Sequence, residues 1–116
     1  MTEDFGRFLP LSPATLHILL SLAPEARHGY GIMQDVLRQS EGHYKIGPGT
    51  LYDNLRKLLE QALVEEVPGE MERDDPRRRY YRLTRFGRKV LTAEVTRLES
   101  VVREAKAALR PASGRA

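Results

Sequence analysis

The segment from Lys45 to Lys57 holds the side chains that are best suited to binding a nucleic acid. Gly47 and Gly49 remove side chains at the start of an expected helix, where free backbone amides and the helix dipole favour a phosphate. The alternative is that this Gly-Pro-Gly sequence is only a turn before an ordinary helix. Hydroxyl, amide and charged groups follow, and these types contact phosphates and base edges. The candidate DNA contacts are Lys45, Gly49, Thr50, Tyr52, Asp53, Asn54, Arg56 and Lys57.

Several of these candidates have two chemically reasonable roles. Arg56 can pair bidentately with guanine and Asn54 with adenine. Asn54 lies closer to the apolar face of the helix, however, so bracing the helix is its alternative role. Asp53 can accept a hydrogen bond from cytosine or orient Arg56, whereas Lys57 suits a phosphate. Tyr52 can donate to a phosphate or pack against a neighbouring hairpin.

An acidic run is followed directly by a basic run in the second half of the chain. Seven carboxylates and a single arginine lie within residues 60–75, and seven basic residues without an acid lie within residues 77–89. Such runs form either a solvated surface hairpin or, for the basic arm, a surface that faces phosphate. Arg77 and Arg78 lie nearest the expected tip, so we add them to the candidate DNA contacts.

The residue types exclude several classes of site. Cysteine is absent, so disulfides, thiolate zinc sites and cysteine nucleophiles are excluded. The histidines, which are His17, His28 and His43, lie at no metal-ligand spacing, and no phosphate-cradling loop of the P-loop form occurs. We therefore expect no enzymatic activity, no cofactor and no metal.

Charge and hydropathy narrow the class of protein further. The formal net charge is +3 and the sequence pI is about 9.4, which is compatible with a nucleic-acid partner. The longest purely apolar stretch, at residues 18–20, is too short to span a bilayer, and no signal segment opens the chain. We expect a cytoplasmic protein that does not associate with a membrane.

The elements that must position these side chains follow from periodicity and turn residues. We expect three helices at residues 13–22, 30–39 and 48–62, strands at 63–67 and 79–83, and a final helix at 85–109. On the second helix, Ile32, Val36 and Leu37 are expected to face the core and Asp35 to face outward. The order predicts a mainly α, winged helix-turn-helix fold with a two-stranded β-wing, in which the third helix enters the major groove.

The final helix carries a narrow apolar seam. Its apolar residues are spaced four, three, four, three and four apart, which is typical of a helix that pairs with another helix. A helix over residues 85–109 would be about 37 Å long, more than a small domain needs for itself. We therefore expect a DNA-binding domain with an N-terminal extension at residues 1–84, a dimerisation helix at 85–110 and a disordered tail at 111–116. The seam consists of Leu91, Val95, Leu98, Val102, Ala105 and Leu109.

Three motifs in order carry a resemblance to a known family. They are HGYGI (residues 28–32), PGTLYDNLRKLLEQALV (48–64) and RRYYRLTRFGRKVL (78–91). They resemble the PadR family of bacterial transcriptional regulators, and the length is similar to its short branch, in which one C-terminal helix supplies dimerisation. The resemblance implies a homodimeric repressor that binds a palindromic operator in double-stranded DNA and is released by a small-molecule effector. Two features depart from the family: the first arm of the wing is acidic, and the chain contains no tryptophan. Some members of the short branch bind a drug between aromatic side chains, and without tryptophan this chain has no obvious equivalent of that site.

Two further expectations concern partners. An effector would need an apolar cleft near the two-fold axis of the dimer, and its expected lining is Phe5, Phe8 and Leu91. The alternative function is a winged-helix interaction module that binds a different polypeptide through its C-terminal helix, because folds of this kind host both functions.

Overall fold

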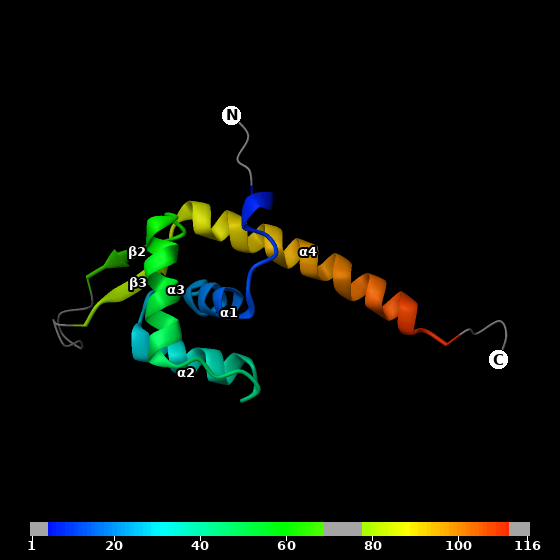
Figure 1. Ribbon diagram of the computed structural model, residues 1–116, viewed down its shortest axis with the longest axis horizontal. Coiled ribbons are helices and arrows are strands. Elements are labelled where there is room, and N and C mark those ends of the chain that lie inside the picture. The colour runs from blue at the N-terminus through cyan, green and yellow to red at the C-terminus, as the bar shows by residue number, and fades with distance from the viewer. Residues whose placement is uncertain (1–4, 69–77, 112–116) are drawn as a thin grey trace.

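The computed structural model describes residues 5–68 and 78–111, and Figure 1 shows a small body from which one long helix extends. The mainly helical fold with a β-wing is confirmed. In chain order the elements are η1 (Gly6–Phe8), α1 (Pro13–Leu22), β1 (Arg27–His28), α2 (Gly29–Gln39), α3 (Pro48–Glu60), β2 (Val64–Val67), β3 (Tyr80–Leu83) and α4 (Arg85–Leu109).

The sheet has one strand more than the sequence predicted. Its order is β1-β3-β2 and both pairings are antiparallel, with Val64 opposite Leu83 in the wing. The two-stranded wing of β2 and β3 is confirmed, and β1 adds a third strand to the sheet because Arg27 pairs with Tyr81 on the other edge of β3. A two-residue strand is too short to show any alternation, so the segment before α2 reads as a turn in the sequence.

Helix α1 lies at the centre of the body, as its apolar character on several sides predicts. Ser12 caps it by accepting a hydrogen bond from the Thr15 amide, and Pro13 occupies the first turn. Its side chains Ile18, Leu19 and Leu22 are fully buried against α2, α3 and α4. The rest of the core consists of Ile32, Val36, Ile46, Leu51, Leu55, Leu58, Leu63, Val64, Tyr81, Leu83, Val90 and Leu91.

The polar and apolar sides of α2 differ from the prediction at two positions. Leu37 is 41% exposed, whereas Asp35 is only 8% exposed. Asp35 is turned inward because two arginines meet it there: Arg38 donates to Oδ1 at 2.9 Å and Arg27 lies 3.6 Å away. A buried carboxylate needs such partners to offset its lost hydration.

Helix α4 begins inside the body. Thr84 caps it by accepting from the Gly87 amide, as predicted, and its hydroxyl donates to the Ala62 carbonyl at 2.6 Å. A Cβ on Gly87 would lie 1.9 Å from the Leu63 carbonyl oxygen, so glycine lets the helix lie directly against the end of the α3–β2 turn. Val90 then packs in the same core as α1.

The second half of α4 leaves the body (Figure 1). Every residue from 101 to 110 is exposed, so this half has no apolar support within the described part of the subunit. Residues 112–116, the expected tail, lie outside the described residues. None of the helices within residues 5–68 and 78–111 is both long and apolar enough to cross a membrane.

A candidate nucleic-acid interface on α3 and the wing

The first turn of α3 is open to a ligand. Gly47 is the N-cap and no side chain caps the helix, so the amides of the first turn remain available. A Cβ built on Gly49 would meet no atom within 4 Å, and the residue is exposed. Lys45 is also exposed, two residues before the cap.

The outer face of α3 presents the predicted polar side chains. Leu51, Leu55 and Leu58 are buried on the opposite face and attach the helix to the body. Because the helix turns 100° per residue, the residues between them must face outward. The structure leaves five of the candidates exposed, and they are Thr50, Tyr52, Asp53, Arg56 and Lys57.

Asp53 connects the two basic residues of this face. Arg56 donates to its Oδ1 at 2.5 Å, and the Lys57 ammonium lies 3.8 Å from Oδ2. All three side chains are at least half exposed, so these pairs contribute little to stability, about 0–1 kcal/mol each. The carboxylate therefore holds both cations toward solvent, which agrees with its predicted role of orienting Arg56.

Asn54 is held by the body. Thr15 donates to its side-chain carbonyl at 3.1 Å, and its amide nitrogen donates to the Thr50 backbone carbonyl at 2.8 Å. These two bonds connect α3 to α1 and favour the bracing role over contact with adenine.

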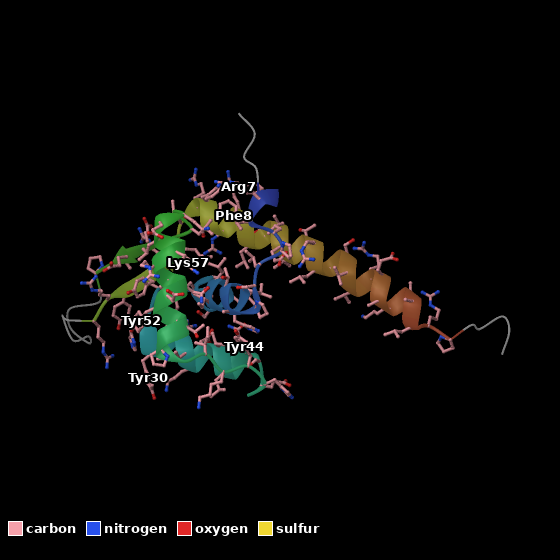
Figure 2. All side chains as sticks on the ribbon, in the orientation of Figure 1. Arg7, Phe8, Tyr30, Tyr44, Tyr52 and Lys57 are labelled. Carbon is pink, nitrogen blue, oxygen red and sulfur yellow. The ribbon has the colours of Figure 1, made fainter. Side chains whose placement is uncertain are left out.

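A cleft of about 340 Å³ lies between Tyr52 of α3, the start of α2 and the wing. The Tyr52 hydroxyl fits over Gly29, where an added Cβ would lie 2.2 Å from it, so Tyr52 contacts the start of α2. Tyr30 is 60% exposed beside it, a position that sequence periodicity did not single out (Figure 2). Burial, and then the charge of Glu66, raises the pKa of the Tyr81 phenol, which keeps its proton near neutral pH. The lining consists of His28, Gly29, Tyr30, Tyr52, Arg78, Arg79 and Tyr81.

The outer end of the wing strands places two arginines beside this cleft. The Arg78 guanidinium lies 3.2 Å from His28 Nε2, and Arg79 pairs with Glu66 at 3.4 Å. Both arginines are exposed, and Arg79 was not among the candidate DNA contacts predicted from the sequence. Arg77 lies outside the described residues.

Only part of the predicted α4 seam is exposed, because its first residue is buried within the body of the subunit. Leu91 was predicted both in the seam and in the lining of an effector cleft. It is buried in the core of its own subunit, so it lies neither on the exposed part of the seam nor in an open cleft. Leu98 is half-buried, whereas Val95, Val102 and Leu109 are exposed.

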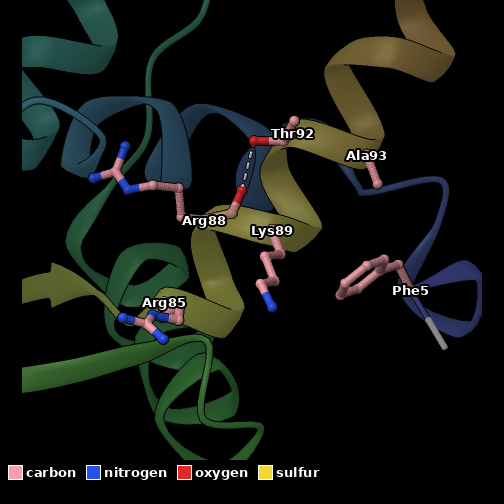
Figure 3. Close-up of a pocket in the computed structure, with 6 residues that line it drawn as sticks. All are labelled: Phe5, Arg85, Arg88, Lys89, Thr92 and Ala93. Carbon is pink, nitrogen blue, oxygen red and sulfur yellow. Dashed lines mark hydrogen bonds between the residues drawn. The ribbon is translucent and has the colours of Figure 1, made fainter. Parts of the chain in front are cut away.

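A second cleft, of about 630 Å³, lies between the N-terminal segment and α4 (Figure 3). Of the residues predicted to line an effector site, Phe5 lines this cleft. Phe8 instead packs edge-on against Phe86, with 5.6 Å between the ring centroids. The lining consists of Phe5, Arg85, Arg88, Lys89, Thr92 and Ala93.

Glu94 connects the N-terminal segment to α4 and was not anticipated. It is 1% exposed and accepts hydrogen bonds from Arg97 at 2.5 and 3.0 Å and from the Leu11 amide at 2.8 Å. The bonds from Arg97, and then that from Leu11, hold the pKa of the Glu94 carboxyl below its usual range. No sequence signal marks Glu94, because its partner Leu11 is 83 residues away.

Comparisons with known proteins agree with this geometry. Residues 18–93 match the transcriptional regulator PadR-like family. The chain is 37% identical over 89 residues to the transcriptional regulator Rv3488 of Mycobacterium tuberculosis, which covers 77% of this chain and 78% of that protein.

Two solved structures show the fold. A PadR family transcription regulator from Clostridium difficile R20291 has a TM-score of 0.72 at 19% identity, over 85% of this chain and all of that one. Bacillus subtilis PadR in complex with operator DNA has a TM-score of 0.62 at 19% identity, over 74% of this chain and 48% of that one. With two thirds of its length matched, the chain belongs to the PadR-like family, a family of transcriptional regulators and not of enzymes.

Proposed function

We propose that this chain is a homodimeric repressor that binds a palindromic operator in double-stranded DNA in the cytoplasm. The observation that carries this proposal is the outer face of α3. The fold gives α3 an uncapped first turn with an open glycine, and it holds two cations outward on Asp53. Such a helix fits the major groove, which is about 12 Å wide.

The wing and the cleft beside Tyr52 extend this surface. Arg78 and Arg79 lie at the outer end of the wing strands, and the Tyr52 hydroxyl lies at the start of α2, so cations and hydroxyls flank the recognition helix. These groups suit phosphates on either side of the groove, where they position the helix without reading bases. The complex of Bacillus subtilis PadR with operator DNA supports the same use of a similar fold.

The protruding half of α4 supports a dimer. Isolated helices are marginally stable in water, and the ten exposed residues at 101–110 need a partner surface. A two-fold symmetric pair would present two α3 helices to half-sites about one helical turn, roughly 34–36 Å, apart.

Release by a small ligand is the remaining part of the proposal. The cleft beside Phe5 combines the Phe5 ring with the side chains of three basic residues and lies against α4, whose position would set the separation of the two recognition helices. A ligand bound there releases DNA if it prefers the dimer in which that separation does not match the operator.

Binding of the protein to the DNA upstream of its own gene tests the proposal. Arg56→Ala should cost about 1–3 kcal/mol, which is roughly 5- to 150-fold in affinity, with little effect on unrelated DNA. Lys57→Ala should weaken binding to all sequences and reduce the slope of log affinity against log salt by about one.

Arg110→Ala is the matched control, because it removes an exposed arginine at the far end of α4 and should leave affinity unchanged. Binding that does not depend on salt and is unaffected by both α3 variants would contradict the proposal.

A further inference from the structure

The His28 ring lies between two groups that can only donate hydrogen bonds. Its Nδ1 accepts from the Gly31 amide at 3.3 Å and thereby caps α2, and its Nε2 lies 3.2 Å from the Arg78 guanidinium. The ring is held in place because His28 pairs with Tyr80 across β1 and β3 and packs edge-on against the Tyr80 ring, with 5.2 Å between the centroids. Both ring nitrogens therefore face an N–H group.

One imidazole cannot accept from both of these donors. In the neutral ring one nitrogen carries the proton and only the other accepts, and the charged ring accepts at neither nitrogen. A guanidinium has no acceptor atom. When Nδ1 accepts from Gly31, the Nε2–H group and Arg78 are thus two donors that face each other. An anionic oxygen between them would accept from both, and the exposed Arg78 side chain can shift to admit it.

The cleft around this pair is suited to a phosphate of DNA. His28, Arg78 and Tyr52 line it together, and no carboxylate is among its lining residues. Glu66 pairs with Arg79 at 3.4 Å, whereas Arg78 has no carboxylate partner in the part of the chain that the structure describes. Because Tyr52 belongs to α3, an anion in this cleft lies directly beside the proposed recognition helix.

We propose that His28 and Arg78 together hold one phosphate of the DNA backbone, with Nε2–H of His28 donating to it while Nδ1 continues to cap α2. This inference rests on the proposed function and adds a histidine that was not among the candidate DNA contacts. The same ring then fixes the start of α2 and holds the duplex, so it positions α2 and the α3 helix packed on it. A phosphate carries no sequence information, so His28 positions the protein without reading bases.

Two amide substitutions separate the two nitrogens of the ring. The asparagine amide reaches the place of Nδ1, and the longer glutamine amide reaches that of Nε2. His28→Asn keeps a good N-cap, so its melting temperature should match the wild type, but its affinity for an unrelated DNA duplex at low salt should fall roughly tenfold. His28→Gln should do the reverse: the melting temperature falls by roughly 4–8 °C and the affinity stays within about threefold of the wild type. His28→Asn that binds DNA as tightly as the wild type overturns the inference, because the histidine then serves only as a cap.

The salt dependence and a double variant test whether the two side chains share one phosphate. Arg78→Gln should weaken binding to every sequence and reduce the slope of log affinity against log salt by about one, whereas His28→Asn removes a neutral donor and should leave the slope unchanged. The double variant should lose at least about threefold less affinity than the product of the two single losses. Losses that multiply independently overturn the shared phosphate. Arg110→Gln is the matched control, since it removes an exposed arginine at the far end of α4 and should change neither affinity nor slope.

The nitrogen-15 resonances of the His28 ring report its tautomer. With the duplex bound at neutral pH, Nε2 should carry the proton and Nδ1 should not. A ring that stays protonated at Nδ1, with Nε2 accepting from Arg78, overturns the inference. Millimolar inorganic phosphate in place of DNA should not fix the tautomer. If it does, and if His28→Asn binds DNA normally, the cleft is a site for a free anion and the assignment to DNA is overturned.

These assays use unrelated duplex DNA, so they do not depend on the operator. A wild type that binds the duplex whether or not His28 is replaced by asparagine refutes only this inference. A wild type that binds no duplex even at low salt refutes both this inference and the proposed function.

Discussion

Two glycines at the ends of helices serve different needs. Gly87 is required by the fold, because the Leu63 carbonyl oxygen occupies the space of a Cβ. Gly49 has open space around it and lies in a helix, where glycine is less stable than alanine by roughly 0.5–1 kcal/mol. Nothing in the described subunit explains glycine at position 49, whereas the proposed approach of a phosphate to α3 would account for it.

We therefore expect Gly49→Ala to separate stability from binding. The melting temperature should stay the same or rise slightly, because the added methyl meets no protein atom. Operator affinity should fall at least tenfold, or about 1.4 kcal/mol, because the methyl occupies the space of a phosphate. Thermal unfolding and a DNA-binding titration on the same preparation measure both quantities.

Gly87→Ala provides the opposite case. It should lower the free energy of unfolding by about 1–3 kcal/mol, since α4 must move away from the α3–β2 turn.

The Gly49→Ala prediction has its own contradicting outcome. Operator affinity that is unchanged in Gly49→Ala would show that no partner approaches this part of α3.

At the scale of elements, the N-terminal segment is attached to α4 by a single buried carboxylate. Glu94 accepts from the Leu11 amide and from Arg97, and Phe5 and Phe8 add contacts with the Phe86 ring. The wall of the cleft beside Phe5 therefore depends on the charge of Glu94.

The lowered pKa of Glu94 makes this attachment sensitive to acid. A carboxyl whose pKa is lower in the folded state stabilises the fold above its unfolded pKa of about 4.3, and this contribution is lost as the pH falls through the folded pKa. At pH 7 the wild type should be more stable than Glu94→Gln by about 1–3 kcal/mol, and the difference should shrink below about pH 4. Urea unfolding at several pH values measures it.

The exposed Glu104 supplies the comparison, since Glu104→Gln removes a carboxylate from the exposed half of α4 and should leave the free energy of unfolding at pH 7 unchanged. A stability difference for Glu94→Gln that is constant from pH 7 to pH 3 would refute the role of the charge.

At the scale of the whole molecule, the proposed homodimer would have to hold two recognition helices at a distance that matches the duplex. One subunit presents a single α3, and its long α4 extends away from the body rather than covering it (Figure 1). In the proposed dimer, the packing of the α4 helices would set the separation of the two α3 helices, so the seam would contribute to DNA binding.

Val102→Asp should separate the subunits without unfolding them. Val102 is exposed and makes no part of the core, so its replacement leaves the body intact. An aspartate in the seam would have to be buried without a partner, so the dissociation constant of the dimer should rise at least tenfold. Sedimentation equilibrium measures this constant, and circular dichroism checks that the helices remain.

Ser100→Asp places the same charge on the opposite side of α4 and should leave the dimer intact. Equal sedimentation of the two variants would show that the seam is not the interface. Dimerisation of the wild type only with another polypeptide would favour the interaction module instead.

Much of this architecture is determined by short stretches of sequence. The caps at Ser12 and Thr84 and the apolar stripe of α3 act within one or two helical turns, so composition and spacing are enough to predict them. The exposed face of α3 follows from the same stripe, which is why most candidate DNA contacts were found on the surface. The heptad spacing of α4 is likewise local, and it predicted the exposed apolar positions Val95 and Val102.

Tertiary contacts decided the rest. Periodicity shows which residues share a face but not what that face meets, so Asp35 turned inward to two arginines and Leu37 outward. Leu91 belongs to the body because it is buried in the same core as α1, although its spacing continues the seam. Glu94 became a buried link because residue 11 folds back onto it. Local sequence determined the helices and their faces, whereas contacts between distant residues decided which face serves the core and which is left for a partner.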